Sequence, residues 1–169
     1  MKLAKHESNM QTSELGISLI KEFEGCKLTA YPDVVGVWTI GFGTTRINGE
    51  PVVKGMTCTQ QDAEDYLRED LQAFEQVVNS ILPAPILQYQ FDACVCLSYN
   101  IGSGGFLSSS LCRKLKTGNT GLVNEQNFVA WNKVRDSHGV LVESRGLTRR
   151  RKSEYHLFST GVVQTQFPF

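Results

Sequence analysis

The chain has 169 residues, enough for one domain with a buried core, and 41% of them are hydrophobic while 20% are charged. This ordinary composition excludes a disordered, collagen-like or coiled-coil protein. The net charge of zero hides a division: residues 1–100 carry 7 basic and 13 acidic side chains, whereas residues 101–169 carry 10 and 4. The basic half suits an anionic polymer, a nucleic acid or acidic groups within the chain, so charge alone identifies no partner.

The N-terminal residues lack the hydrophobic segment of a signal peptide. The longest apolar run, residues 34–42, is too short and too rich in glycine to span a bilayer. We therefore expect a product that stays in the cytoplasm when it is made, without stable membrane insertion.

The cysteines are odd in number and lack the spacing of a zinc site, and no histidine lies near any of them in the sequence. Free, buried thiols are the prediction, with no metal and no cofactor. The five positions are Cys26, Cys58, Cys94, Cys96 and Cys112.

In chain order, the polar residues 1–12 predict a flexible N-terminal arm. Ser13 is placed to cap a helix whose apolar positions recur at helical spacing, with Glu24 in its last turn and Gly25 as the C-terminal cap. From Lys27 onwards, strand-like residues interrupted by glycines predict a small antiparallel sheet of two or three strands.

Thr59 opens a long amphipathic helix that ends near residue 81, and the almost entirely apolar segment 86–99 predicts a buried central helix. Shorter helices are expected at residues 107–116, 124–134 and 145–158. The basic run from Arg149 to Lys152 is interpreted as a solvated helix face.

These elements predict an α+β fold that is mostly helical. We expect one domain over residues 13–161, in which a small sheet-bearing lobe (13–60) is joined by helix 59–81 to a helical lobe (82–161). Residues 162–169 form a C-terminal tail.

Glu24, Asp33 and Thr39 lie within sixteen residues and are the strongest candidates for catalysis. A glycosidic oxygen is a poor leaving group, so its hydrolysis needs an acid that still holds a proton and a partner that activates water. The end of a helix and apolar neighbours favour the protonated acid at Glu24. A turn favours an ionised Asp33, and Thr39 is placed across the hairpin to hold the water.

Each of the three has a simpler explanation by itself, as a helix-end charge, a turn residue and a strand residue. Taken together with the residues around them, however, the three favour a catalytic site. The residues concerned are Phe23, Glu24, Gly25, Ala30, Tyr31, Asp33, Gly36, Thr39, Ile40, Gly41 and Gly43.

This pattern, with eight residues between Glu and Asp and five between Asp and Thr, resembles that of the phage-type lysozymes, the endolysin group. The resemblance implies a lysozyme-like fold with Glu24 as general acid and with Asp33 and Thr39 positioning or activating water. It implies an inverting cleavage of the β-1,4 bond between N-acetylmuramic acid and N-acetylglucosamine in peptidoglycan.

The resemblance continues at Tyr99-Asn100-Ile101-Gly102, at Gly105-Phe106, at residues 108–111 and in the segment from Gly146 to Glu154. It implies that Tyr99, Asn100, Phe106 and Ser109 contribute to saccharide binding. Two departures stand out. Thr44 occupies a position where the family commonly has His, which predicts a changed cleft polarity or pH optimum, and the 135–144 loop is longer than usual.

Two alternatives remain open. The first is a lytic transglycosylase that cleaves the same bond, in which the acid works alone. The second is a non-catalytic module that acts on the wall or membrane through its basic C-terminal helix and cleaves no bond. We expect a monomer that binds peptidoglycan and no nucleic acid. It would remain in the host cytoplasm until a holin-type pore releases it to the cell wall.

Overall fold

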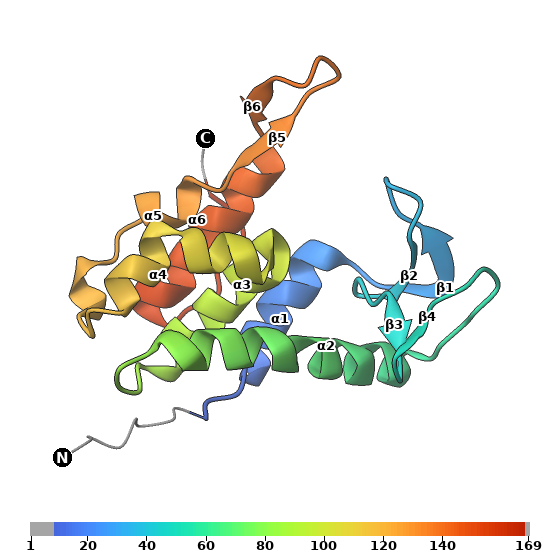
Figure 1. The fold of residues 1–169 in the computed structure, drawn as a ribbon, viewed down its shortest axis with the longest axis horizontal. Helices are drawn as coiled ribbons and strands as arrows, with labels where there is room; N and C mark the ends of the chain where they lie inside the picture. Colours follow the sequence, from blue (N-terminus) through green and yellow to red (C-terminus); the bar gives the residue numbers. More distant parts are fainter. Residues whose placement is uncertain (1–8, 168–169) are drawn as a thin grey trace. The chain divides into compact units, whose positions relative to one another are not determined.

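The computed structural model describes residues 9–167 of the chain, which divide into two compact units (Figure 1). We call Ile20–Ala73 the small unit, and the described residues up to Leu19 and from Phe74 onwards the large unit. The division falls within two continuous helices, α1 (Glu14–Glu24) and α2 (Gln60–Ile81). The fold is α+β, as the sequence predicts, with small antiparallel sheets among helices.

The small unit contains two separate two-stranded antiparallel sheets. In one sheet β1 (Lys27–Pro32) pairs with β2 (Trp38–Gly41), and in the other β3 (Arg46–Ile47) pairs with β4 (Glu50–Pro51). A buried cluster of Ala30, Ile40 and Val52 forms the core. Packed against it are the half-buried Trp38, Ile47, Met56, Cys58 and Tyr66.

A glycine turn separates the two sheets. Gly41 has a φ of 64°, and a Cβ added to it would lie 3.2 Å from the Cβ of Ala63 on α2. Only glycine combines this left-handed backbone with so close an approach to a helix. The β1–β2 pairing therefore ends here, which explains why two sheets form in place of a single sheet with a third strand.

The predicted ends of the first two helices are confirmed. The Ser13 hydroxyl accepts a hydrogen bond from the Leu15 amide at 3.3 Å, and Gly25, with φ 67°, donates its amide to the Lys21 carbonyl at 3.2 Å. Thr59 and Asp62 cap α2 reciprocally, because each side chain accepts from the other residue's amide. Local sequence thus defines the helix that carries Glu24.

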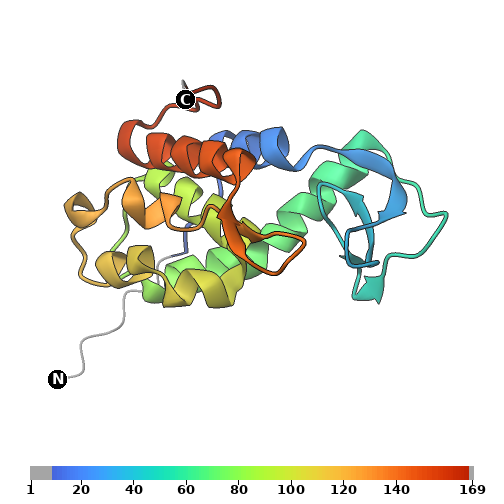
Figure 2. The same cartoon turned by 90° about the horizontal axis from the view of Figure 1, so that it is seen from above.

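In the large unit, α3 (Gln88–Ser108) packs mainly against α6 (Arg145–Thr160), and shorter helices complete the core (Figures 1 and 2). These are α4 (Ser110–Leu115), α5 (Gln126–Val129) and the 3-10 helix η1 (Thr120–Leu122). The fully buried side chains of the unit include Phe91, Leu97, Phe106, Leu111, Leu115 and Phe128.

The structure corrects two predicted helices. The predicted helix 86–99 continues as α3 to Ser108, with a break at Gly102, where φ is 82° and ψ is 155°. The predicted helix 124–134 is wrong at its C-terminal end. There α5 stops at Val129, and an antiparallel hairpin of β5 (Lys133–Arg135) and β6 (Leu141–Glu143) follows.

The β5–β6 hairpin replaces most of the expected 135–144 loop. One carboxylate oxygen of Asp136, Oδ1, accepts the amides of His138 at 2.8 Å and Val140 at 2.9 Å, and Gly139 has a φ of 77°. An aspartate that binds amides two and four residues ahead closes a tight turn. The valines on either side of it therefore pair as strands.

Within residues 9–167, no helix is both long enough and apolar enough to cross a membrane. In the same range, no group of three or more His, Cys, Asp and Glu side chains is placed to hold a metal ion. All five cysteines are free. Cys94, Cys96 and Cys112 are buried, but Cys26 is exposed, so the prediction of buried thiols is wrong for Cys26.

Candidate active site

Asp33 lies in the turn between β1 and β2 and holds that turn closed. Its Oδ1 atom accepts the amides of Val35 at 2.9 Å and Val37 at 2.8 Å. Its own amide donates to the Val37 carbonyl at 2.9 Å. Among the described residues, no donor bonds the second oxygen, Oδ2, so this oxygen is available to a water molecule or a ligand.

Thr39 lies on β2, close to the turn that Asp33 closes. Thr39 pairs with Tyr31, and Asp33 follows β1 two residues beyond Tyr31. Both side chains bond the Val37 backbone, Asp33 through the amide and Thr39 through the carbonyl. The threonine exposes 4% of its surface, and its hydroxyl donates to the Val37 carbonyl at 3.0 Å. The hydroxyl keeps its lone pairs, so it can accept a hydrogen bond from a water molecule.

Glu24 is the last residue of α1. Gly25 and Cys26 connect it to Lys27, the first residue of β1. Its side chain is half-buried. The positive φ of Gly25 turns the chain out of the helix and into the strand. All three predicted catalytic residues therefore belong to the small unit and to consecutive elements of it.

Thr44 and Asp70 form a polar pair inside the small unit. The buried Thr44 hydroxyl donates to Asp70 Oδ2 at 2.6 Å. Burial raises the pKa of Asp70, and the Thr44 hydrogen bond opposes that rise. Asp70 was not predicted as part of the site. At the position where the resemblance places a histidine, this chain thus has a neutral donor bonded to a carboxylate.

Two of the predicted saccharide-binding residues are accessible in the large unit. Tyr99 is half-buried, and its ring packs edge-on against Phe74 with 5.3 Å between ring centroids. Asn100 is exposed, and its Oδ1 atom accepts a hydrogen bond from Arg151 Nη2 at 2.9 Å. Asn100 therefore combines a fixed orientation with contact to solvent.

The other two predicted binding residues are internal. Phe106 has no exposed surface and Ser109 has 3%. The Ser109 hydroxyl caps α4, since it accepts the Cys112 amide at 3.0 Å and donates to the Phe106 carbonyl at 2.6 Å. Their direct contact with a saccharide stays a prediction that this burial does not support.

A pocket of about 490 Å³ lies beside Asn100 in the large unit. Helix α3, the segment after α5, the β5–β6 hairpin and the first turn of α6 contribute to it. Its lining residues are Asn100, Ile101, Ala130, Trp131, Lys133, Leu141 and Leu147. A pocket in which apolar side chains surround a few polar groups is typical of a ligand site, and this pocket combines both kinds of residue.

Sequence reasoning did not predict Lys133, Leu141 and Leu147 as parts of a common site. Lys133 and Leu141 belong to the hairpin, which was read as the end of a helix and a loop. Alternating valines around an Asp-x-x-Gly turn at residues 134–142 were the available signal for this hairpin.

Comparison with known proteins gives a consistent result over most of the chain. The family model described as "Phage lysozyme" matches residues 21–154. An endolysin of Bacillus phage PZA is 44% identical over 154 residues, a match that covers 90% of this chain and 56% of that relative. The chain therefore spans about half the length of that relative.

Two solved structures are similar in fold as well as in sequence. An endolysin from Escherichia coli O157:H7 phage FAHEc1 has a TM-score of 0.85 and 39% identity, covering 94% of this chain and 99% of its own. The muramidase domain of SpmX from Asticaccaulis excentricus has a TM-score of 0.80 and 34% identity, covering 89% and 98%. The matched family segment includes Glu24, Asp33, Thr39 and Asn100.

Proposed function

Since the chain belongs to the phage lysozyme family, we propose that it is an endolysin-type muramidase, which hydrolyses the β-1,4 bond between N-acetylmuramic acid and N-acetylglucosamine in bacterial peptidoglycan. The observation that carries the proposal is that Asp33 and Thr39 both bond the backbone of Val37, in the hairpin that follows the Glu24 helix. The names of the relatives support it, because an endolysin and a muramidase domain are similar over most of this chain.

In the proposed reaction Glu24 acts as the general acid and donates its proton to the glycosidic oxygen as the bond to the anomeric carbon breaks. A water molecule donates one hydrogen bond to Asp33 Oδ2 and the other to Thr39 Oγ1. As the water oxygen attacks the anomeric carbon from the opposite side, Asp33 takes its proton. Attack from that side inverts the configuration of the sugar.

The first test is the Glu24→Gln variant, which keeps the size and polarity of the side chain but has no proton to give. We expect it to fold and to lose the ability to clear a suspension of bacteria whose outer membrane has been permeabilised. Glu22→Gln is the matched control, because Glu22 is an exposed residue of the same helix and should stay fully active. Full lysis by Glu24→Gln would contradict the proposal.

The transglycosylase alternative is separated by its products. Hydrolysis leaves a reducing N-acetylmuramic acid end, whereas transglycosylation leaves an anhydro-muramyl end that is lighter by one water. Mass spectrometry of digested sacculi distinguishes the two ends. We expect reducing ends, and we expect Asp33→Asn to reduce their release by at least about a hundredfold, as is usual for the loss of a general base.

The non-catalytic alternative rests on the basic segment from Arg149 to Lys152, whose interpretation as a solvated face is wrong for two of its residues. Arg150 and Arg151 expose 5% and 0% of their surfaces and are paired with Glu154. A membrane-active helix needs its cations at the surface. A peptide of residues 145–158 should therefore fail to kill the permeabilised bacteria that the whole protein lyses.

We further propose that the protein acts as a monomer, that it remains in the host cytoplasm, and that a holin-type pore gives it access to the wall. Expression of the chain alone in bacteria tests the last two points. The cells should keep growing until a pore-forming protein is co-expressed or chloroform is added. Spontaneous lysis would contradict the need for a pore.

A further inference from the structure

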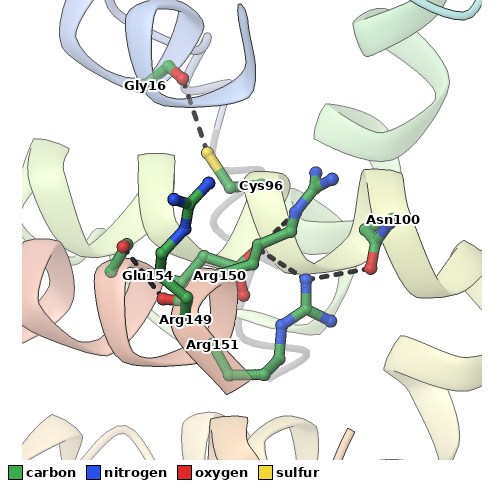
Figure 3. A network of polar contacts seen from close by, with 8 residues as sticks. Gly16, Cys96, Asn100, Arg149, Arg150, Arg151 and Glu154 are labelled. Atoms are coloured by element: carbon green, nitrogen blue, oxygen red, sulfur yellow. Dashed lines mark hydrogen bonds and ion pairs between the residues drawn. The ribbon is translucent and has the colours of Figure 1, made fainter. Parts of the chain in front are cut away.

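Two arginines and one glutamate of α6 are buried together in the large unit (Figure 3). Glu154 Oε1 accepts Arg150 Nε at 3.2 Å and Arg151 Nη2 at 2.8 Å, and neither Arg151 nor Glu154 has any exposed surface. In the described part of the chain, Arg151 Nε, Arg151 Nη1 and Glu154 Oε2 have no hydrogen-bond partner. The cluster thus buries polar atoms that have no hydrogen-bond partner.

Such an arrangement is poorly explained by stability alone. Taking charges out of water costs free energy that a buried ion pair regains only when its remaining polar atoms are also bonded. Several atoms of this cluster are not bonded. Arg151 also has a hydrogen-bond partner outside the cluster, and this partner indicates a second role.

That partner is Asn100, on α3. Arg151 Nη2, the atom that bonds Glu154, also donates to Asn100 Oδ1 at 2.9 Å (Figure 3). A guanidinium only donates, so it fixes which way the carboxamide faces: the oxygen must point to Arg151 and the NH₂ group away from it. The Asn100 Nδ2 atom is thereby left as a donor of fixed direction.

Asn100 is exposed and lines the 490 Å³ pocket, whereas Arg151 is internal. Asn100 and Lys133 lie among apolar side chains such as Ile101, Leu141 and Leu147 in the lining. In a pocket of this kind a few placed polar groups orient the ligand. A donor whose rotation is already restricted loses less entropy on binding than a free one.

We propose that Arg151 is a positioning residue, which holds the Asn100 carboxamide so that its NH₂ group donates to an amide carbonyl of a ligand in the pocket. The class of ligand rests on the proposed function, because N-acetyl groups and peptide bonds supply the amide carbonyls of peptidoglycan. The charge of Glu154 holds Arg151 in turn, so the buried cluster acts on the ligand through a single accessible side chain.

The test is a double-mutant cycle on the full-length chain that measures binding and not turnover. All proteins carry Glu24→Gln, so that the ligand is not cleaved, and Trp38→Phe, so that the fluorescence of Trp131 in the pocket wall reports occupancy. The probe is a soluble peptidoglycan fragment of two disaccharides with their peptides. The variants are Asn100→Asp, Asn100→Ala, Arg151→Lys and the Asn100→Ala/Arg151→Lys pair.

Asn100→Asp should weaken binding about tenfold without lowering Tm, because the carboxylate still accepts from Arg151 but has no NH₂ to donate. Arg151→Lys should weaken binding in the parent and have no further effect in the Asn100→Ala protein. Lys152→Gln is the matched control, since Lys152 is the neighbour of Arg151 on α6 but lies outside the cluster, and it should leave the dissociation constant unchanged.

Equal binding by Asn100→Asp, or an equal effect of Arg151→Lys with and without the Asn100 side chain, would overturn the proposal. If Arg151→Lys does not fold, the Asn100→Asp protein decides alone. The outcomes are separable from those of the proposed function. Lysis by Glu24→Gln contradicts the muramidase, whereas independent effects in the cycle contradict only the positioning role.

Discussion

At the scale of single residues, the pair of Thr44 and Asp70 shows how a neutral donor changes the behaviour of a half-buried carboxylate. A cationic partner would favour the ionised acid strongly, whereas a hydroxyl favours it only through one hydrogen bond. Desolvation therefore remains the larger effect, and the pKa of Asp70 is raised in the folded protein. Protein stability must then depend on pH through this residue.

The direction of that dependence follows from proton binding. With the pKa of Asp70 raised above its ordinary value of 3.8, the folded state binds more protons than the unfolded state, so Asp70 favours folding at low pH. This contribution is lost as the pH rises through the folded pKa. Asp70→Asn should therefore gain stability relative to the parent between about pH 3 and about pH 7.

Urea unfolding of both proteins at the two pH values measures this difference. Asp65→Asn is the control, because Asp65 is an exposed residue of the same helix, and its relative stability should change little with pH. A constant difference between Asp70→Asn and the parent across the range would contradict the assigned pKa direction.

At the scale of elements, the β1–β2 hairpin combines a structural and a proposed catalytic task in Asp33. One oxygen closes the turn through two backbone amides, and the other is open to a ligand. The Val37 amide is one of these two, and the Val37 carbonyl accepts the Thr39 hydroxyl, so the closed turn holds Asp33 and Thr39 close together. The rigidity of the turn and the position of the proposed base are therefore properties of the same side chain.

Two substitutions of Asp33 separate these tasks. Asp33→Asn removes the charge but keeps an oxygen for the two amides, whereas Asp33→Ala removes both. We expect both variants to lose activity, and Asp33→Ala to be less stable than Asp33→Asn by about 0.5–1.5 kcal/mol, the usual net contribution of a hydrogen bond whose donors are exposed. Equal unfolding free energies for the two variants would show that the side chain does not hold the turn.

Helix α3 offers a second comparison within one element. Gly102 adopts φ 82° and ψ 155°, a backbone conformation that only glycine adopts readily, whereas Gly104 has ordinary helical geometry and open space where a Cβ would lie. Gly102→Ala should destabilise the protein by about 1–3 kcal/mol. Gly104→Ala should stabilise it by about 0.5–1 kcal/mol through helix propensity.

Thermal unfolding of the two variants beside the parent measures both effects. Because Gly102 follows Ile101 in the pocket wall, Gly102→Ala should also weaken ligand binding. Opposite shifts in Tm are the expected result. Shifts of the same sign would mean that the break in α3 does not require glycine at position 102.

At the scale of the whole molecule, the exposure of the five thiols differs between the two units. In the small unit Cys26 is exposed and Cys58 is half-buried, whereas Cys94, Cys96 and Cys112 are buried in the large unit. Burial raises the pKa of each of these thiols, most strongly for Cys94 and Cys96. The thiolate is the reactive form, so reactivity should follow exposure.

Titration with a thiol reagent at neutral pH should modify Cys26 first and Cys58 more slowly. The three thiols of the large unit should react only when the protein is unfolded in denaturant. Mass spectrometry of the modified peptides identifies each site, and Cys26→Ser should remove the fast phase. Rapid reaction of Cys94 or Cys96 in the native protein would contradict the assigned core.

The amino-acid sequence was sufficient to predict the class of fold, the family, and the helices whose ends are set by local chemistry. Ser13, Gly25 and the Thr59–Asp62 pair act on backbone groups within four residues of themselves, so their effect can be read without coordinates. The catalytic roles of Glu24, Asp33 and Thr39 came from spacing and resemblance, and they stay predictions until the variants are measured.

The remaining features became visible only in the packed chain. Packing placed Phe106 and Ser109 in the interior, turned the expected helix end near residue 134 into a hairpin, and joined Asn100 to Arg151 and Thr44 to Asp70. The physical reason is distance along the chain. Caps and turns depend on neighbours in sequence, whereas burial and these polar pairs depend on residues 26 and 51 positions apart, which meet only when the chain is packed.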